Sequence, residues 1–106
     1  MTTARKRINR GRPIGSTSTD PTIAVAFGRA VVVLRTAAGL SQEALGLAAA
    51  IGRSNMSALE NGRSVPNFVG VVKIASALGC SLPVLMREFE RAYQALLKEQ
   101  VGVDQG

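Results

Sequence analysis

A chain of 106 residues with 46% apolar residues has room for one compact domain, and two independent domains are not expected. Aromatic residues make up only 4% and tryptophan is absent, so the core must consist of Ala, Val, Leu and Ile, which favours a small all-α bundle. The net charge is +6, and with one cysteine and no histidine neither an internal disulfide nor a Cys/His zinc site is expected.

The basic residues are concentrated at the N-terminus. Residues 1–12 contain five basic residues and no acidic one, whereas residues 13–106 contain eight basic and seven acidic residues. A basic segment beside a nearly neutral globule is typical of proteins that bind a polyanion, most often nucleic acid and less often an anionic membrane surface. Residues 1–19 lack apolar periodicity and are predicted to form an arm that is disordered until it binds a partner.

Folded structure is predicted to begin at Asp20 and Pro21, an N-cap acceptor followed by a proline, whose missing amide hydrogen costs nothing at the first helical position. This first helix should run to about Ala37 and stop at Gly39. Arginines interrupt its apolar runs, so no membrane-spanning helix is expected. The basic N-terminus also lacks the pattern of a signal peptide, and the protein is expected to stay in the cytoplasm.

Two short helices follow. Ser41 is the predicted N-cap of a helix over residues 42–49, and residues 50–52 form a tight turn. A third helix over residues 53–61 then ends at Gly62.

A fourth helix is predicted over residues 68–78, opened by Pro66 and Asn67 and ended by Gly79. Its buried face is predicted to contain the apolar residues at helical spacing, which are Phe68, Val71, Val72, Ala75 and Leu78.

The last helix starts at Ser81, covers residues 82–101 and precedes a tail over residues 102–106. Its apolar stripe is longer than a four-helix globule can cover, so its first two turns should complete the core and the rest should form a dimer surface. The predicted dimer residues are Phe89, Ala92, Tyr93, Leu96 and Leu97. The alternative is that this part packs back on the first helix.

Residues 41–62, SQEALGLAAAIGRSNMSALENG, resemble the helix-turn-helix of the lambda-repressor-like (Cro/CI, XRE-type) family. Apolar residues stand where that motif locks its two crossed helices, namely Leu45, Ala49, Ile51, Met56 and Leu59. Gly46 stands where the family needs a small residue, and Ala50 where it usually has glycine. The resemblance extends over residues 27–85 and implies a five-helix DNA-binding bundle whose DNA-binding domain covers residues 20–81.

The resemblance further implies that the second helix of the pair, the reading helix over residues 53–61, lies in the major groove. Its base-facing residues would be Arg53, Ser54, Ser57 and Ala58. Arg53 can donate two hydrogen bonds to O6 and N7 of guanine. A phosphate contact or a solvated charge is the alternative. Ser54 and Ser57 can bond to several bases, whereas Ala58 can touch only a thymine methyl group.

Phosphate contacts are expected at both ends of the motif, from Ser41, Gln42, Asn55, Asn61 and Arg63. Gln42 opens a helix whose free amides and positive dipole end can hold a phosphate, a role that the resemblance also implies for its side chain. Asn61 and Arg63 follow the reading helix and would hold the next phosphates, although Asn61 is also a good helix C-cap.

Arg35 and Glu60 stand at positions that form an ion pair in several members of the family. Such a pair would fix the angle between two helices and leave guanidinium nitrogens near the DNA. Two unrelated surface charges are the alternative.

The arm contains an Arg-Gly-Arg-Pro sequence that matches the core of an AT-hook. Glycine lets the backbone lie deep in a narrow minor groove, proline keeps the chain extended, and arginine favours the negative potential there. Unspecific attraction to phosphates is the alternative. The arm residues concerned are Arg10, Gly11, Arg12 and Pro13, with Arg5, Lys6 and Arg7 before them.

Together these features predict a homodimeric transcription regulator of bacterial or phage type that is associated with the nucleoid and acts as a repressor. It is expected to bind a double-stranded operator with half-sites about 34 Å apart. An antitoxin or a restriction-modification controller of the same fold and a protein-interaction module are the alternatives. An enzyme is not expected, because no histidine, carboxylate pair, phosphate-binding glycine loop or activated nucleophile is visible. No cofactor, metal or membrane partner is expected.

Overall fold

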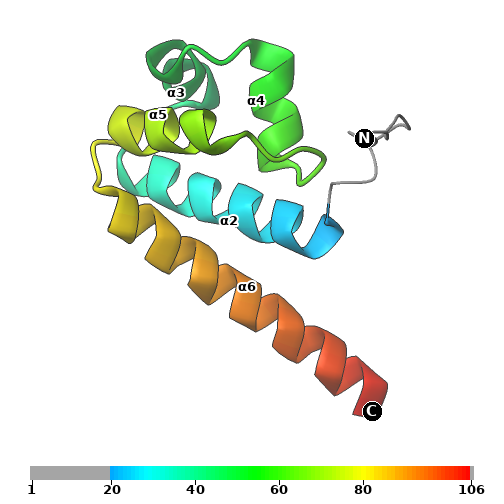
Figure 1. The fold of residues 1–106 in the computed structure, drawn as a ribbon. Helices are drawn as coiled ribbons and strands as arrows, with labels where there is room; N and C mark the ends of the chain where they lie inside the picture. Colours follow the sequence, from blue (N-terminus) through cyan, green and yellow to red (C-terminus); the bar gives the residue numbers. More distant parts are fainter. Residues whose placement is uncertain (1–19, 106) are drawn as a thin grey trace, which may run out of the picture.

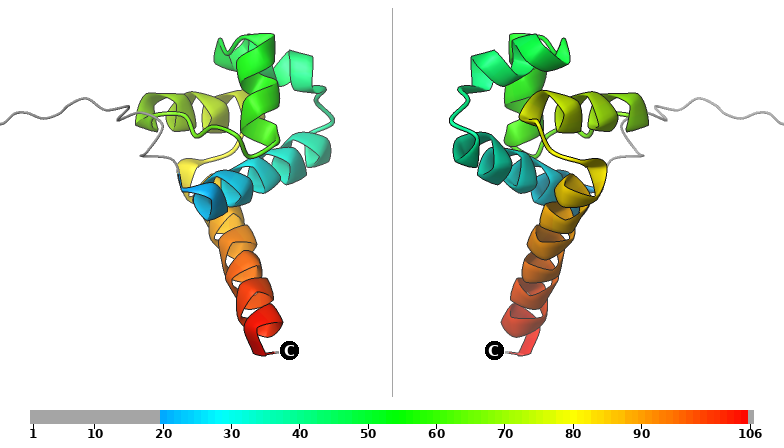
Figure 2. Two further views of the ribbon diagram at one scale, coloured as in Figure 1. Left: turned by 90° about the vertical axis from the view of Figure 1, so that its right-hand side faces the viewer. Right: turned by 90° about the vertical axis from the view of Figure 1, so that its left-hand side faces the viewer.

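The computed structural model describes residues 20–105, and this part of the chain forms five helices and no strand (Figure 1). The helices are α2 (Pro21–Ala37), α3 (Gln42–Ala49), α4 (Arg53–Glu60), α5 (Phe68–Leu78) and α6 (Leu82–Gln105). The predicted all-α five-helix bundle is therefore confirmed. Helices α3, α4 and α5 lie together on one side of α2, whereas α6 packs against α2 from the other side and extends away from the rest (Figure 2).

Side-chain caps fix where the helices begin. The side-chain oxygens of Asp20, Ser41 and Asn67 accept hydrogen bonds of 2.9 to 3.1 Å from backbone amides in the first turns of α2, α3 and α5. These amides have no partner inside their own helix, so each cap stabilises its helix by about 1 kcal/mol. The predicted starting points of all three helices are confirmed.

The turn between α3 and α4 is built on a residue with an uncommon backbone conformation. Ala50, the C-cap of α3, has φ 59° and ψ 42°, which is the left-handed region that favours glycine. Its amide donates to the carbonyl oxygen of Leu47 and the next amide, of Ile51, donates to that of Gly46, so the turn keeps its hydrogen bonds. The helix-turn-helix therefore closes without glycine at the left-handed position of the turn, at a cost in backbone strain.

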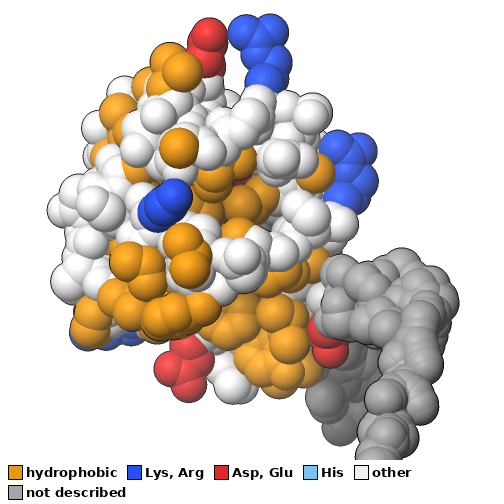
Figure 3. Space-filling view, turned by 45° about the horizontal axis from the view of Figure 1, so that its top comes forward, with side chains coloured by type: hydrophobic (Ala, Val, Ile, Leu, Met, Phe, Trp, Pro, Cys, Tyr) orange, Lys and Arg blue, Asp and Glu red, His pale blue; other side chains and the backbone are white. Residues whose placement is uncertain are grey.

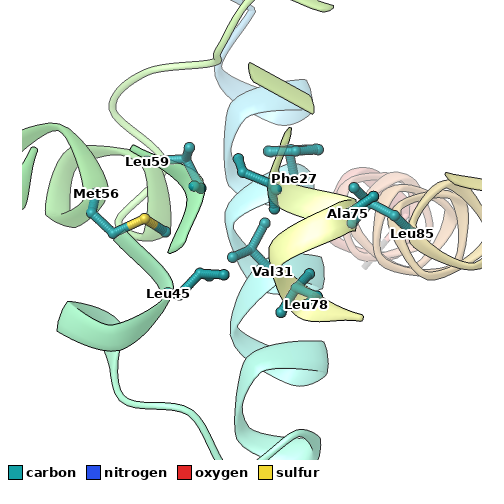
Figure 4. Packing of buried hydrophobic residues seen from close by; sticks show 10 residues of the cluster. Phe27, Val31, Leu45, Met56, Leu59, Ala75, Leu78 and Leu85 are labelled. Carbon is teal, nitrogen blue, oxygen red and sulfur yellow. The ribbon is translucent and has the colours of Figure 1, made fainter. Parts of the chain in front are cut away.

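All five described helices contribute to one hydrophobic core. Figure 4 shows side chains from α2, α3, α4, α5 and α6 converging on its centre. The buried cluster consists of Phe27, Val31, Leu45, Ala49, Met56, Leu59, Ile74, Ala75, Leu78 and Leu85. On the α6 side, the ring of Phe89 lies 6.4 Å from that of Phe27 and stacks on Tyr93 at 5.6 Å. The first turns of α6 thus belong to the same core as the helix-turn-helix.

The buried face of α5 differs from the predicted one. Phe68 and Val72 are 67% and 42% exposed, whereas Ile74 is completely buried. The spacing of Val71, Ile74, Ala75 and Leu78 already gives a full apolar stripe, and it is centred on the side of Ile74. Phe68 and Val72 consequently lie on the flank of the stripe, and their assignment to the core was wrong.

Two helix ends also differ. Helix α6 continues to Gln105, so the tail expected over residues 102–106 is wrong for residues 102–105. A glycine such as Gly102 costs a helix only about 1 kcal/mol relative to alanine and need not end it. Helix α4 ends at Glu60 with Asn61 as its C-cap.

No single helix in the described residues is long and apolar enough to cross a membrane. Two bent helix pairs reach the required length and composition only when the two helices of each pair are taken together.

Candidate nucleic-acid interface

Helix α4 is held by its apolar face and presents its first turn to solvent. Met56 and Leu59 are 1% and 3% exposed and lock the helix to the core. The predicted reading residues Arg53 and Ser54 are exposed, whereas Ser57 and Ala58 are half-buried. The structure therefore makes the N-terminal end of α4 the most accessible part of the helix.

Three of the predicted DNA-contacting residues come together in one hollow. An open hollow of about 530 Å³ separates the N-terminal turns of α3 and α4, and Ser41, Gln42 and Arg53 line it. Leu47 lines the same hollow and is 78% exposed, a large apolar side chain that sequence reasoning did not single out. Gln42 and Arg53, which are 11 residues apart in the chain, thus line the same hollow.

Glu43 is a second residue of this hollow that sequence reasoning missed. Its Oε2 lies 3.4 Å from Nη2 of Arg53, and the two side chains are 67% and 82% exposed. The sequence shows that each residue lies in the first turn of a short helix, but their contact depends on how α3 and α4 pack. Among the ion pairs of the described residues, Glu43 is the acidic partner of Arg53, the predicted reading residue.

The carboxylate of Glu60 joins three helices. It accepts hydrogen bonds from Nε and Nη2 of Arg35, at 2.6 and 3.1 Å, and from Nε2 of Gln42 at 2.9 Å. The remaining nitrogen of Arg35, Nη1, donates to the carbonyl oxygen of Leu40 at 2.8 Å. The ion pair expected between α2 and α4 is present, with side chains only 15% and 5% exposed.

This network gives two candidate DNA-contacting side chains partners inside the protein. The guanidinium of Arg35 uses three of its five N–H groups in these hydrogen bonds, one from each nitrogen. Gln42 uses one amide hydrogen for Glu60 and has a second one for another acceptor. Gln42 is therefore both a structural residue and a candidate phosphate ligand.

The predicted phosphate ligands Asn61 and Arg63 are exposed at the C-terminal end of α4, away from the hollow. The side-chain Nδ2 of Asn61 donates to Oγ of Ser57 at 3.3 Å. Asn61 is also the C-cap of α4, which was the other role expected for it. Asn55 is exposed and lines a second hollow, of about 310 Å³, beside the start of α5. The candidate residues thus lie along α4 from one end to the other.

Gly46 provides the space that the turn needs. A Cβ atom on Gly46 would lie 2.9 Å from the carbonyl oxygen of Ile51 and 3.6 Å from the side chain of Met56. The close neighbour is therefore a carbonyl group of the turn, and a larger residue at this position would push the turn away from α3.

The residues predicted for dimerisation lie on α6, which packs along α2. All five are half-buried within the monomer, and Nε2 of Gln100 donates to Oγ1 of Thr22 at 3.2 Å, so contacts between α6 and α2 reach as far as Gln100. Other apolar side chains are more exposed, and the face shown in Figure 3 has broad hydrophobic areas with few charged groups. We call Val65, just before α5, and Phe68, Val69 and Val72 on α5 the exposed α5 patch.

The residues predicted for the minor groove or for phosphates, Arg5, Lys6, Arg7, Arg10, Gly11, Arg12 and Pro13, lie outside the residues that the structure describes.

Two short helices cross at a tight turn, and the second is fixed by its apolar face with its polar first turn outward, a geometry that defines a DNA-binding helix-turn-helix protein. Consistent with this class, the family model described as a helix-turn-helix domain matches residues 26–89, more than half of the chain. The chain belongs to this helix-turn-helix domain family.

Solved structures of regulators are similar to this chain. The restriction-modification controller protein C.AhdI from Aeromonas hydrophila is 37% identical, with a TM-score of 0.56 over 58% of this chain and 94% of that protein. The clp gene regulator ClgR from Corynebacterium glutamicum is 24% identical, with a TM-score of 0.69 over 78% of this chain and 87% of that one, a likeness that shows the fold alone. A comparison with curated protein sequences found no match.

Proposed function

We propose that this protein is a sequence-specific regulator of transcription that binds a double-stranded operator as a homodimer and represses by its position on the DNA. The observation that supports it best is the exposed first turn of α4, where Arg53 stands beside the N-terminus of α3 and its Gln42. In this arrangement Arg53 donates to O6 and N7 of a guanine in the major groove. Ser54 and Ser57 bond to neighbouring bases, and Ala58 contacts a thymine methyl group.

Phosphates are held on both sides of the groove in this proposal. Ser41 and Gln42 bind one phosphate at the N-terminus of α3, where free amides and the helix dipole favour an anion. Asn61 and Arg63 bind phosphates at the other end of α4, and Asn55 faces the backbone beside it. The basic arm over residues 1–19 adds contacts to the minor groove or to phosphates.

The charge distribution supports separate roles for α4 and the basic arm. The arm contains five basic residues and no acidic residue, and the rest of the chain is almost neutral. Sequence preference would therefore come from α4, and most of the salt-dependent affinity from the arm. In a cell the protein would act in the cytoplasm, on nucleoid DNA.

A salt titration of binding to random and selected duplexes tests the proposal. The intact protein is compared with Arg53→Ala, with a chain that lacks residues 1–19, and with Arg91→Ala as a control for the loss of one exposed positive charge on α6. Arg53→Ala should lower the preference for the selected site about tenfold. Removal of the arm should flatten the salt dependence by about 0.9 in log–log slope for each phosphate that the arm neutralises.

Arg91→Ala should leave both quantities close to those of the intact protein. If no duplex binds in any form at low salt, the DNA proposal is wrong and a protein-interaction module takes its place.

A restriction-modification controller is the second candidate. The similarity to C.AhdI, at 37% identity over 94% of that protein, favours it over other regulators of this fold. Such a protein would bind an operator next to the genes for a nuclease and a methyltransferase. Binding of the purified protein to the DNA upstream of its own gene, with those two genes as neighbours, would distinguish it from a general repressor.

A further inference from the structure

Arg53 and Glu43 place a hydrogen-bond donor and a hydrogen-bond acceptor side by side in the hollow between α3 and α4. Oε2 of Glu43 and Nη2 of Arg53 are 3.4 Å apart, and both side chains are mostly exposed. An ion pair so exposed adds little to the stability of the fold. An acidic residue in the first turn stabilises α3 through the helix dipole, but this effect does not require a contact with Arg53.

A carboxylate is also unexpected at a surface that faces DNA. Glu43 follows Gln42 directly and lines the same hollow as Ser41, Gln42 and Arg53. Phosphates repel it on every DNA sequence, so it weakens binding in general. The repulsion is offset only where a DNA base offers the carboxylate a hydrogen-bond donor.

The edge of a G·C pair offers such a donor next to the atoms that Arg53 is proposed to bind. In the major groove guanine presents the acceptors N7 and O6, and the paired cytosine presents the donor N4 beside O6. O6 and N4 are about 2.9 Å apart, because they are hydrogen bonded to each other. The separation of 3.4 Å between the Arg53 donor and the Glu43 acceptor is close to this spacing.

The order of the groups also selects one base pair. Two donors from Arg53 followed by an acceptor from Glu43 match the sequence of N7, O6 and N4 on a G·C pair. An A·T pair places the donor N6 between the acceptors N7 and O4, so one donor of Arg53 would face another donor.

We propose that Glu43 is a specificity-determining residue that accepts a hydrogen bond from N4 of the cytosine paired with the guanine bound by Arg53. This inference rests on the proposed function and adds the second base of the pair to it. Glu43 lowers affinity for DNA in general and recovers it at one G·C pair, which raises the ratio between specific and non-specific binding.

The test begins with selection of preferred duplexes from a random library by the intact protein and by Arg53→Ala. The G·C pair whose preference is lost in Arg53→Ala marks the site of the Arg53 and Glu43 side chains. At that pair, cytosine is replaced by N4-methylcytosine, which removes the exposed amino hydrogen. Binding of both duplexes is then measured for the intact protein, Glu43→Ala, Glu43→Gln and Glu90→Ala, the last removing an exposed acidic charge on α6.

The intact protein and Glu90→Ala should lose about tenfold in affinity on the methylated duplex, and Glu43→Ala less than twofold. Glu43→Gln retains a carbonyl acceptor and should keep most of the preference, whereas a purely electrostatic role would make it resemble Glu43→Ala. Equal losses for the intact protein and Glu43→Ala would overturn the inference while leaving the reading role of Arg53 intact. An unchanged selection by Arg53→Ala, or no duplex binding at all, would overturn the proposed function and this inference together.

Discussion

Gly28 on α2 lies directly against the backbone of Leu59 on α4. A Cβ atom on Gly28 would be 2.6 Å from the carbonyl oxygen of Leu59 and 2.9 Å from that of Glu60. Real side chains do not approach a carbonyl oxygen so closely, and the obstacle is backbone, which cannot turn away. The glycine therefore sets how closely the last turn of the reading helix approaches α2.

Substitution of Gly28 should displace α4. Gly28→Ala is expected to destabilise the fold by about 1 to 3 kcal/mol, because the added methyl group forces the two backbones apart. Gly52→Ala is a control without a steric clash, since a Cβ on Gly52 meets nothing within 4 Å and its φ is −65°. Because glycine is a better N-cap than alanine, this control should lose less than about 1 kcal/mol. Urea unfolding of both variants checks this, and equal stabilities would contradict the close approach.

The ion pair between Arg35 and Glu60 should be among the largest side-chain contributions to stability. Arg35→Ala leaves the carboxylate of Glu60, whose side chain is only 5% exposed, with a single amide donor. A loss of about 3 to 5 kcal/mol in the free energy of unfolding is expected. Arg91→Ala, which breaks an exposed contact of 3.9 Å, should change stability by less than about 1 kcal/mol.

The double variant Arg35→Met with Glu60→Leu distinguishes a buried unpaired charge from a simple loss of packing. It removes both charges and should be more stable than Arg35→Ala alone. Chemical denaturation of the three proteins gives the comparison. Arg35→Ala as stable as Arg91→Ala would show that the network contributes nothing.

Ala50 offers a stabilising substitution. Its left-handed conformation strains an alanine but not a glycine, so Ala50→Gly should raise the free energy of unfolding by about 1 kcal/mol. For a domain of this size that corresponds to a rise of about 4 to 8 °C in Tm. Gly79→Ala is the opposite change in the same conformation, with φ 76° and no atom within 4 Å of the added Cβ. Thermal melts should shift in opposite directions, and a lower Tm for Ala50→Gly would refute the argument.

The predicted dimer surface on α6 can be separated from the exposed α5 patch. Leu97→Glu places a charge in the predicted α6 surface and should shift sedimentation velocity profiles from dimer to monomer. Phe68→Ser alters the α5 patch and should leave the dimer unchanged. Circular dichroism confirms that both variants are folded. A monomeric Phe68→Ser with a dimeric Leu97→Glu would move the interface to α5.

The parts of the fold that follow from local chemistry were predictable from sequence. Asp20, Ser41 and Asn67 are acceptors placed directly before an apolar period, and each caps a helix at the expected residue. The burial of α5 was only partly predictable, because Ile74 and Phe68 are both compatible with an apolar stripe. The choice between them depends on how α5 is rotated against α3 and α6, which no local signal specifies.

The site divides in the same way. The pairing of Arg35 with Glu60 was predictable only through the family resemblance, because no local pattern links two residues that are 25 positions apart. The third partner, Gln42, and the contact between Glu43 and Arg53 depend on the angle and separation of α3 and α4. Such geometry arises only when the helices have packed.

The convergence of α2, α3 and α4 on the carboxylate of Glu60 has a consequence for the DNA. Because the last residue of the reading helix is tied to both other helices, α4 cannot tilt or slide on its own to follow an irregular groove. We therefore expect adaptation to fall on the duplex, which has to bend or narrow to meet a fixed protein surface. Flexibility of base steps that the protein never touches would then contribute to operator choice.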